Sequence, residues 1–280
     1  MRVLMSGALG FTGHYVKEEL EKNNHEVVAL SSDLLDYEGV KSEVLDVKPD
    51  AFLHLAAVTF VAHANALDFY RVNLLGTYHL LEILHQYCPN IQSVMLVSSA
   101  NVYGNGDETI LSEEATPNPT NDYAVSKLAM EHMAKLWIDR LPLFIVRPFN
   151  YTGVGQRENF LIPKIVSHFK KRASTIELGN LDVWREFGDV RMVAEIYGKL
   201  LALAPVGKTL NVCTGEAHSL REVIAMASEL TCHPLHIEVN KAFVREGEVR
   251  VLKGDNSQLK ALVPTWTPKP FKETLAWMLA

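Results

Sequence analysis

The stretch VLMSGALGFTGHYV, residues 3–16, decides the fold of this chain. A short apolar run leads through three glycines into a segment with helical spacing. Glycine suits a tight turn, lets the backbone approach a pyrophosphate and lets helix and strand pack closely, while the amino end of the helix attracts phosphate. The stretch therefore predicts a dinucleotide-binding loop formed by Gly7, Gly10, Phe11, Thr12 and Gly13. A plain turn before a closely packed helix is the alternative, which the position directly after the first strand makes weaker.

Apolar, β-branched runs recur along the first two-thirds of the chain and alternate with helix-like segments. The runs are RVLMS, EVVALS, AFLHLAA, SVMLVSS, LFIVRP and TLNVC, and the helix-like segments cover residues 12–22, 37–47, 69–88 and 121–139. This alternation predicts an α/β fold with a doubly wound parallel sheet. From residue 150 the alternation of strand-like and helix-like segments becomes less regular. We therefore expect a dinucleotide-binding Rossmann domain at 1–150, which also receives segments from 185–215, and a smaller C-terminal substrate-binding lobe mainly at 151–280.

The charge and cysteine content exclude several classes of protein. The 280 residues carry a formal net charge of -6, and no Lys/Arg cluster stands out, which argues against nucleic acid or an anionic membrane as partner. No apolar stretch of about 18 residues occurs, and the first glycine comes too early for a signal peptide. The three cysteines, Cys88, Cys213 and Cys232, are odd in number and far apart. They predict a reduced, cytoplasmic protein with no metal site.

The second apolar run ends where a dinucleotide fold usually places an acid that binds the adenosine ribose. Ser31 and Ser32 stand there instead. Without that carboxylate a 2′-phosphate is not repelled, so the expected cofactor is NADPH or NADH, with NADPH slightly preferred. Asp33 could bond the adenine amino group, or it could simply belong to a surface turn. Leu34 is the next expected cofactor contact in this segment.

NDYAVSKLAM, residues 121–130, places a tyrosine and a lysine four apart on one face of a predicted helix. The Lys127 ammonium would lower the pKa of Tyr123 from about 10, and the phenol could then exchange a proton with an oxygen whose carbon gains or loses hydride. Lys127 could also hold the cofactor ribose. Ser99, at the end of the fourth strand, could donate a hydrogen bond to the same oxygen. A surface Tyr–Lys pair and a turn serine are the alternatives.

Seven motifs together run over most of the chain. They are GALGFTG (7–13), HLAA (54–57), NLLGT (73–77), SSANVYG (98–104), YAVSK (123–127), RPFN (147–150) and REFGDV (185–190). With this set the chain resembles the extended short-chain dehydrogenase/reductases of the NAD-dependent epimerase/dehydratase family, and within them the enzymes that act on nucleotide-diphosphate sugars. The resemblance implies a Rossmann fold, a nucleotide-sugar substrate that is GDP-linked, and a homodimer.

The resemblance also implies roles for individual residues. Ser99, Tyr123 and Lys127 match the catalytic triad. The residues that match the cofactor contacts are Gly7, Gly10, Phe11, Thr12, Gly13, Ser31, Asp33, Leu34, Leu55, Ala56, Ala57, Tyr123 and Lys127. The residues that match the substrate contacts are Asn101, Asn150, Arg185, Arg245 and Glu248. In that match Arg185 and Arg245 bind the diphosphate and Glu248 binds the nucleotide ribose. For each arginine the alternative is an ordinary surface charge exposed to solvent.

Asn101 separates the reactions that the resemblance leaves open. In the family's 4,6-dehydratases a glutamate stands at this position and in its GDP-fucose synthases a cysteine, each as an acid/base group, and an amide cannot act as a general base at neutral pH. Reduction of a ketone, or 4-epimerisation through a transient ketone, therefore remains. Of these, the resemblance implies NAD(P)H-dependent reduction of GDP-4-keto-6-deoxy-D-mannose at C4 to GDP-D-rhamnose. A nucleotide-sugar 4-epimerase and a non-catalytic dinucleotide-binding sensor are the alternatives.

Two other parts of the sequence carry expectations. His54 is expected to be a packed core histidine and Asn73 to hold loop backbone near the active site. One helical stripe either forms the dimer contact or packs on the sheet, and it consists of Leu74, Tyr78, Leu81 and Leu84.

Overall fold

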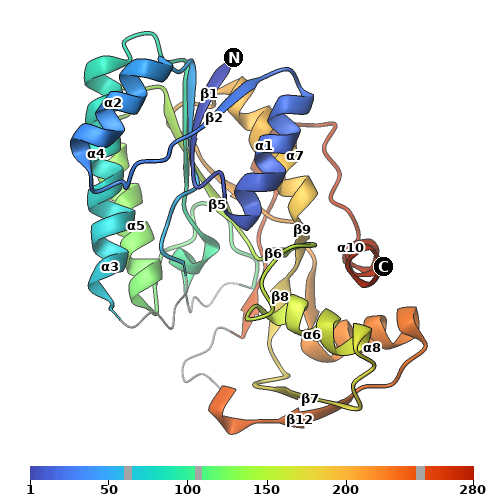
Figure 1. Cartoon of the computed structure of the whole chain (residues 1–280). Helices are drawn as coiled ribbons and strands as arrows, with labels where there is room; N and C mark the ends of the chain where they lie inside the picture. Colours follow the sequence, from blue (N-terminus) through green and yellow to red (C-terminus); the bar gives the residue numbers. More distant parts are fainter. Residues whose placement is uncertain (60–64, 105–108, 244–249) are drawn as a thin grey trace.

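Residues 1–59, 65–104, 109–243 and 250–280 are described by the computed structural model of the chain (Figure 1). A six-stranded sheet lies at its centre, and all the pairings in this sheet are parallel. From one edge to the other its strands are β2 (Glu26–Ala29), β1 (Arg2–Ser6), β3 (Ala51–His54), β4 (Ser93–Val97), β5 (Leu143–Pro148) and β10 (Thr209–Val212).

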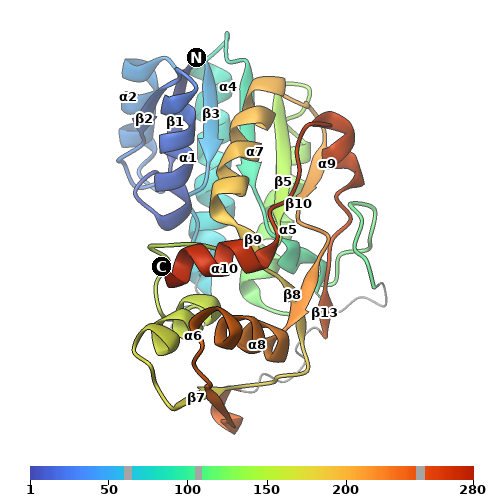
Figure 2. The same cartoon turned by 90° about the vertical axis from the view of Figure 1, so that its right-hand side faces the viewer.

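Helices cover both faces of this sheet (Figures 1 and 2). One face is covered by α1 (Phe11–Lys22), α7 (Val190–Leu203) and α9 (Ser257–Leu262). The other face is covered by α2 (Tyr37–Val47), α4 (Thr77–Tyr87) and α5 (Asp122–Lys135). The predicted doubly wound α/β fold is therefore confirmed.

The apolar run of β1 explains why both faces are covered. Side chains alternate between the two faces of a strand, so a strand between two helical layers needs apolar residues throughout. Val3 and Met5 pack in the core beneath α1 and α7, and Leu4 packs in the core beneath α2 and α4. All three are completely buried. The continuous run thus specifies an inner strand of a covered parallel sheet.

The strand order reverses beside β1. The chain runs from β1 to β2 on one side and then crosses to β3 on the other side. In open parallel sheets, ligands bind outside the carboxyl ends of the strands at the point where the strand order reverses. The glycine loop follows β1 and therefore lies at this point.

The C-terminal part of the chain has a core of its own, in which Phe169, Ile224 and Leu275 are buried. Its helices are α6 (Leu161–Lys170), α8 (Leu220–Thr231) and α10 (Phe271–Leu279). Two small sheets join them, one of β7 (Thr175–Leu178) and β12 (His236–Val239), the other of β11 (Ala217–Ser219), β8 (Trp184–Glu186) and β13 (Val251–Leu252). Since α7 and β10 lie with the large sheet, the chain passes between the two cores more than once.

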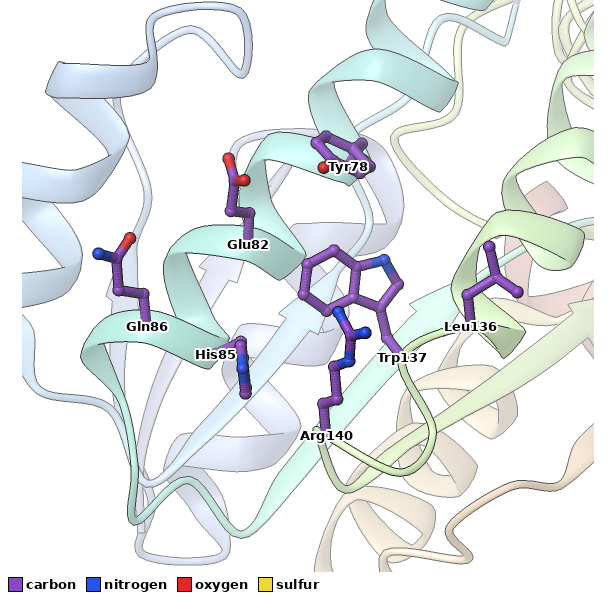
Figure 3. A pocket seen from close by; sticks show the side chains of 7 residues that line it. All are labelled: Tyr78, Glu82, His85, Gln86, Leu136, Trp137 and Arg140. Atoms are coloured by element: carbon purple, nitrogen blue, oxygen red, sulfur yellow. The ribbon is translucent and has the colours of Figure 1, made fainter.

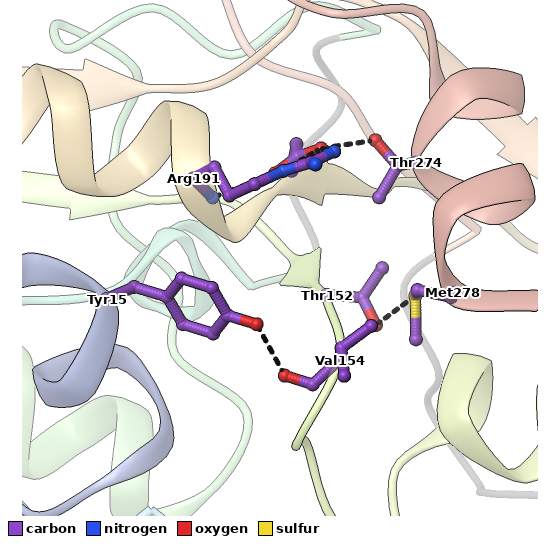
Figure 4. A network of polar contacts seen from close by, with 7 residues as sticks. Tyr15, Thr152, Val154, Arg191, Thr274 and Met278 are labelled. Atoms are coloured by element: carbon purple, nitrogen blue, oxygen red, sulfur yellow. Dashed lines mark hydrogen bonds and ion pairs between the residues drawn. The ribbon is translucent and has the colours of Figure 1, made fainter. Parts of the chain in front are cut away.

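A buried carboxylate fastens α10 to the start of α7 (Figure 4). Asp189 is completely buried, pairs with Arg191 (2.5 Å) and accepts a hydrogen bond from Thr274 (3.0 Å). The Arg191 guanidinium lies 3.6 Å from the ring centre of Trp277 on α10. These contacts set how the smaller core lies against the sheet edge that carries the site.

The predicted helix at 69–88 differs from the structure. It consists of α3 (Leu67–Tyr70), a π-helical segment (Arg71–Gly76) and α4. Within the π-helical segment the buried Asn73 side chain accepts from the Val58 N–H (2.9 Å) and donates to the Val58 carbonyl (3.1 Å). The prediction that Asn73 holds loop backbone is therefore confirmed. Single π-turns interrupt helices often at functional sites, and this one fixes the loop after β3.

Shorter elements complete the described chain. They are the 3-10 helices η2 (Ala100–Tyr103) and η3 (Lys241–Phe243) and the paired strands β6 (Tyr151–Thr152) and β9 (Gly188–Asp189). Within the described ranges, no helix has both the length and the apolar character needed to cross a membrane. Nor do three His, Cys, Asp or Glu side chains in that part of the chain gather so as to hold a metal ion.

Candidate active site

The glycine loop touches the HLAA segment after β3. Gly7 has a φ of +71°, and a Cβ built on it would lie 2.8 Å from the Ala56 nitrogen and 3.0 Å from the Leu55 carbonyl carbon. A Cβ on Gly13 would lie 2.1 Å from the Gly7 carbonyl oxygen. Both positions thus require glycine. Gly10 is the N-cap of α1 and has no side chain to cap it, so the first-turn N–H groups stay available to a phosphate.

The end of β2 is closed by a carboxylate from α2. Glu43 accepts from the backbone N–H and the hydroxyl of Ser31 (2.9 and 2.8 Å) and from the same two groups of Ser32 (2.6 and 2.5 Å). These bonds lower the pKa of Glu43, although partial burial opposes them and is the largest single effect. The premise that no carboxylate lies at this tip is therefore wrong, because Glu43 reaches it from the next helix.

The two neighbouring predicted contacts lie differently. Asp33 accepts a hydrogen bond from the Leu35 N–H (2.9 Å), as in a surface turn. Leu34 is buried in the core beneath α2 and α4. Its side chain is therefore packed within the protein, and a cofactor contact at this position would use its backbone.

Ser99, Tyr123 and Lys127 meet at the carboxyl ends of the strands. Ser99 follows β4, starts η2 and accepts from the Asn101 N–H (3.2 Å). Asn121 caps α5 through the Ala124 N–H (2.9 Å), which places Tyr123 in the first turn and Lys127 one turn further. The Ser99 side chain lies near enough to the Tyr123 phenol to lower its pKa. The three predicted catalytic residues thus lie together.

Burial dominates the protonation of this cluster. It raises the pKa of Tyr123 to about 12, while the Ser99 side chain lowers it and Tyr151 raises it further. Lys127 is not among the described groups that shift it. The Lys127 ammonium instead donates to the Val97 carbonyl (2.8 Å). The prediction that Lys127 lowers the pKa of Tyr123 is therefore wrong for the protein by itself.

Sequence reasoning missed a buried ion pair behind Lys127. Glu131, one turn further along α5, pairs with the Arg147 guanidinium through Nε (2.9 Å) and Nη2 (2.6 Å). It also accepts from the Ser98 hydroxyl (2.5 Å), and the Glu131 side chain is only 1 % exposed. Two signals point to this pair, namely the continued i, i+4 spacing from Lys127 and the place of Arg147 in RPFN.

The same ion pair holds the other end of the segment that carries Ser99 and Asn101. Arg147 donates to the Tyr103 hydroxyl (3.0 Å), and Tyr103 donates to the side-chain oxygen of Asn211 on β10 (2.6 Å). Residues 98–103 are thus fixed by Glu131 at one end and by Arg147 at the other.

Tyr151, directly after Asn150, is a second residue that sequence reasoning missed. Its hydroxyl lies 2.8 Å from the Thr12 hydroxyl, and its ring stacks with Phe11 at 6.4 Å between ring centres. Asn150 itself is exposed, and its carbonyl accepts from the Gly188 N–H (2.8 Å). The RPFN motif therefore ends directly beside the glycine loop.

Some of the predicted substrate-binding residues lie in the described part of the chain and others do not. Arg185 on β8 is half-buried and donates to the Trp184 carbonyl (2.9 Å). Glu186, which follows it, is fully buried and accepts from the backbone N–H groups of Thr214 (2.6 Å) and Gly254 (2.5 Å). This carboxylate fixes β8 and hence the position of Arg185. Arg245 and Glu248 lie outside the described residues.

His54 is a core residue, as expected. It is 1 % exposed, and its two ring nitrogens bond to Ser6 (2.7 Å) and Thr77 (2.9 Å). Burial, with a smaller effect of the Lys127 charge, lowers the pKa of His54 to about 3. A histidine that stays neutral and is bonded on both sides ties β1, β3 and α4 together.

The chain is similar to known proteins over almost its whole length. The sequence profile described as GDP-mannose 4,6 dehydratase matches residues 12–278. This chain belongs to the GDP-mannose 4,6 dehydratase family. The glycine loop, the Ser99–Tyr123–Lys127 cluster and the RPFN segment therefore lie in a fold whose family acts on nucleotide sugars.

Two related proteins match nearly the whole chain. A GDP-6-deoxy-D-talose 4-dehydrogenase from Aggregatibacter actinomycetemcomitans is 38 % identical over 92 % of this chain and 90 % of its own length. A GDP-6-deoxy-D-mannose reductase from Pseudomonas aeruginosa is 31 % identical over 100 % of this chain and 96 % of its own length.

Two solved structures of similar proteins have the same fold. The crystal structure of a putative epimerase from Burkholderia cenocepacia superposes with a TM-score of 0.94 at 43 % identity and covers 99 % of this chain and 96 % of its own. RMD from Pseudomonas aeruginosa, complexed with NADPH, superposes with a TM-score of 0.88 at 29 % identity, and the match covers 100 % of this chain and 98 % of the RMD chain. This chain thus shares its Rossmann-like architecture with both solved structures along its whole length.

Proposed function

We propose that this chain is an NAD(P)H-dependent reductase of the 4-keto group of GDP-4-keto-6-deoxy-D-mannose. The observation that carries the proposal is the cluster of Ser99, Tyr123 and Lys127 at the carboxyl edge of the sheet that also carries the glycine loop, which is the edge where ligands bind. The names of two relatives support the sugar. 6-Deoxy-D-talose and 6-deoxy-D-mannose differ only in configuration at C4, so oxidation of either at C4 gives the same 4-keto sugar.

The protonation states suit reduction. With its pKa raised to about 12, Tyr123 carries its proton at neutral pH and can give it to the sugar oxygen. Ser99 can donate a hydrogen bond to that oxygen and polarise the carbonyl. A bound NAD(P)H supplies the hydride, and the residues proposed to hold it are the glycine loop, Ser31, Leu55 to Ala57, and Lys127. The tight contacts at Gly7 and Gly13 fit such a ligand, because any side chain there would fill the cradle.

Asn101 favours reduction over the dehydration that the family description names. Its backbone N–H is bonded to Ser99, so the residue lies beside the reacting oxygen in this proposal. An amide there can position the sugar, but it cannot remove a proton from it. Arg185, Asn150 and, by the sequence match, Arg245 and Glu248 are proposed to bind the GDP-sugar.

The test is incubation of the purified protein with NADPH, NADH and a panel of GDP- and dTDP-4-keto-6-deoxy sugars. Oxidation of the cofactor only with the GDP-linked 4-keto-6-deoxymannose supports the proposal, and NMR of the product distinguishes GDP-D-rhamnose from GDP-6-deoxy-D-talose. If neither cofactor is consumed with any sugar, the proposal fails. A nucleotide-sugar 4-epimerase is the second candidate because the similar Burkholderia protein is described as a putative epimerase. It would retain its cofactor through dialysis and interconvert sugars without net consumption of NAD(P)H.

The pH dependence of turnover should reflect Lys127. Burial lowers the pKa of Lys127 to about 8, while Glu131 opposes this shift. Lys127 is therefore charged below about pH 8 and loses its proton as the pH rises. We expect kcat to fall above about pH 8 and Lys127→Arg to move that fall to higher pH, because guanidinium keeps its proton. A profile of kcat that stays flat up to about pH 10 would contradict the assignment.

We also propose that the chain forms a homodimer through α4 and the end of α5. A cavity of about 480 Å³ on this surface is lined by Tyr78, Glu82, His85, Gln86, Leu136, Trp137 and Arg140 (Figure 3). Leu136 is 75 % exposed beside the Trp137 ring, and such an apolar group on a surface supports a protein contact. Of the predicted stripe, Leu81 and Leu84 are instead fully buried against the sheet.

Leu136→Asp should dissociate this dimer at micromolar concentration, because a charge would be buried in the centre of the contact. Sedimentation velocity measures the change. Leu203→Asp is the matched control, since Leu203 is 54 % exposed at the end of α7 and lies outside the proposed surface. A wild-type protein that sediments as a monomer, or a Leu136→Asp variant that remains dimeric, would refute the proposal.

A cytoplasmic location is proposed as well. Its support is that Cys88, Cys213 and Cys232 are all free thiols.

A further inference from the structure

The end of β2 is built as an anion site that the chain itself fills. Four donors, the backbone N–H and hydroxyl groups of Ser31 and Ser32, converge on the Glu43 carboxylate at 2.5 to 2.9 Å. Glu43 lies in the second half of α2, twelve residues after Ser31. Two neighbouring N–H groups with two hydroxyls are also what a phosphate would need.

This position matters because of where β2 ends. In a sheet wound about β1, the adenosine ribose of a dinucleotide lies at the tip of the strand that follows the glycine-loop helix. The ribose carries a 2′-hydroxyl in NADH and a 2′-phosphate in NADPH. A carboxylate accepts a hydrogen bond from the hydroxyl but repels the phosphate. A carboxylate at this tip therefore acts differently on NADH and on NADPH.

We propose that Glu43 sets the balance between NADH and NADPH by occupying the donors that a 2′-phosphate would otherwise use. This inference rests on the dinucleotide-binding part of the proposed function and not on the identity of the sugar. With NADH, Glu43 stays on Ser31 and Ser32 and accepts from the ribose. With NADPH, the phosphate must displace Glu43 from these donors, and the two anions repel each other.

Charge removal at Glu43 tests this without any sugar substrate. Dissociation constants of NADH and NADPH are measured by cofactor fluorescence for the wild type, Glu43→Gln and Glu43→Ala. Glu38→Gln is the matched control, because Glu38 lies on the same helix, is 75 % exposed and pairs with the nearby Lys41 (3.0 Å). Binding of 2′-AMP and 5′-AMP is measured alongside to isolate the adenosine end.

The expected result is a change in the ratio of the two affinities. Both Glu43 variants should favour NADPH over NADH by at least about tenfold more than the wild type, and the gain should shrink at high salt. The same variants should gain affinity for 2′-AMP and not for 5′-AMP, and Glu38→Gln should leave both ratios unchanged. Ratios in the Glu43 variants within about twofold of the wild type would overturn the inference, and so would a wild type that binds neither cofactor. A wild type that binds cofactor but reduces no sugar would refute only the proposed reaction.

Discussion

Tyr123→Phe should lower kcat for the 4-keto sugar by about 10³-fold while the dissociation constant of NADPH changes by less than about threefold. The substitution removes one hydroxyl from a side chain that is only 8 % exposed and leaves the ring in place. That hydroxyl lies near Ser99 and, with its pKa raised to about 12 by burial, holds its proton at neutral pH. Since the ring keeps its packing, a loss confined to turnover would identify the proton donor.

The control for this variant is Tyr37→Phe, which also removes one tyrosine hydroxyl. Tyr37 lies at the start of α2, on the same sheet face as α5, and is far from Ser99 in the sequence. It should retain the wild-type kcat. Tyr123→Phe with kcat within about fivefold of the wild type would contradict the assignment and favour a non-catalytic dinucleotide-binding protein.

Glu131→Ala should lower the free energy of unfolding by about 3–5 kcal/mol, because it leaves Arg147 buried and unpaired. The Arg147 and Glu131 side chains are 5 % and 1 % exposed. Burial alone would lower the pKa of the Arg147 guanidinium, but the hydrogen bonds and charge of Glu131 outweigh it and hold that pKa above its usual value. Urea unfolding followed by circular dichroism measures the loss. Glu21→Ala is the control, because its pair with Lys17 lies on the exposed side of α1 and should be worth less than about 1 kcal/mol.

Loss of Glu131 should also impair turnover more than cofactor binding. The Ser98 hydroxyl loses its acceptor, so the end of the 98–103 segment next to Ser99 loses a side-chain anchor, while the bond from Arg147 to Tyr103 at the other end remains. In the milder variant Glu131→Gln, which keeps the shape of the side chain, kcat should fall by about tenfold or more with little change in the dissociation constant of NADPH. Equal stability of Glu131→Ala and the wild type would mean that this ion pair does not hold the site.

Features encoded by neighbouring residues could be predicted from the sequence. The glycine loop and the strand runs depend on local spacing, so residues 3–16 and the alternation that follows were enough to predict the doubly wound sheet. Ser99, Tyr123 and Lys127 could be brought together because the carboxyl ends of parallel strands lie on one edge. His54 and Asn73 were predictable for a similar reason, since each lies next to a buried strand or the loop that follows one.

Features that depend on which elements meet in space could not be predicted. Glu43 closes the end of β2 from another element, so the tip that lacks an acid in sequence has one in the structure. Lys127 bonds to the Val97 carbonyl on a strand thirty residues earlier, and burial rather than the lysine charge governs the pKa of Tyr123. Desolvation depends on the whole surrounding core, which no local pattern contains.

The most direct test of hydride transfer to C4 uses [4,4-²H₂]NADPH with GDP-4-keto-6-deoxy-D-mannose and NMR of the isolated product. The proposed reaction places one deuterium on C4 of the GDP-6-deoxyhexose, and Tyr123→Phe should slow its appearance about 10³-fold. A product without deuterium at C4, or with the label on another carbon, would contradict the account.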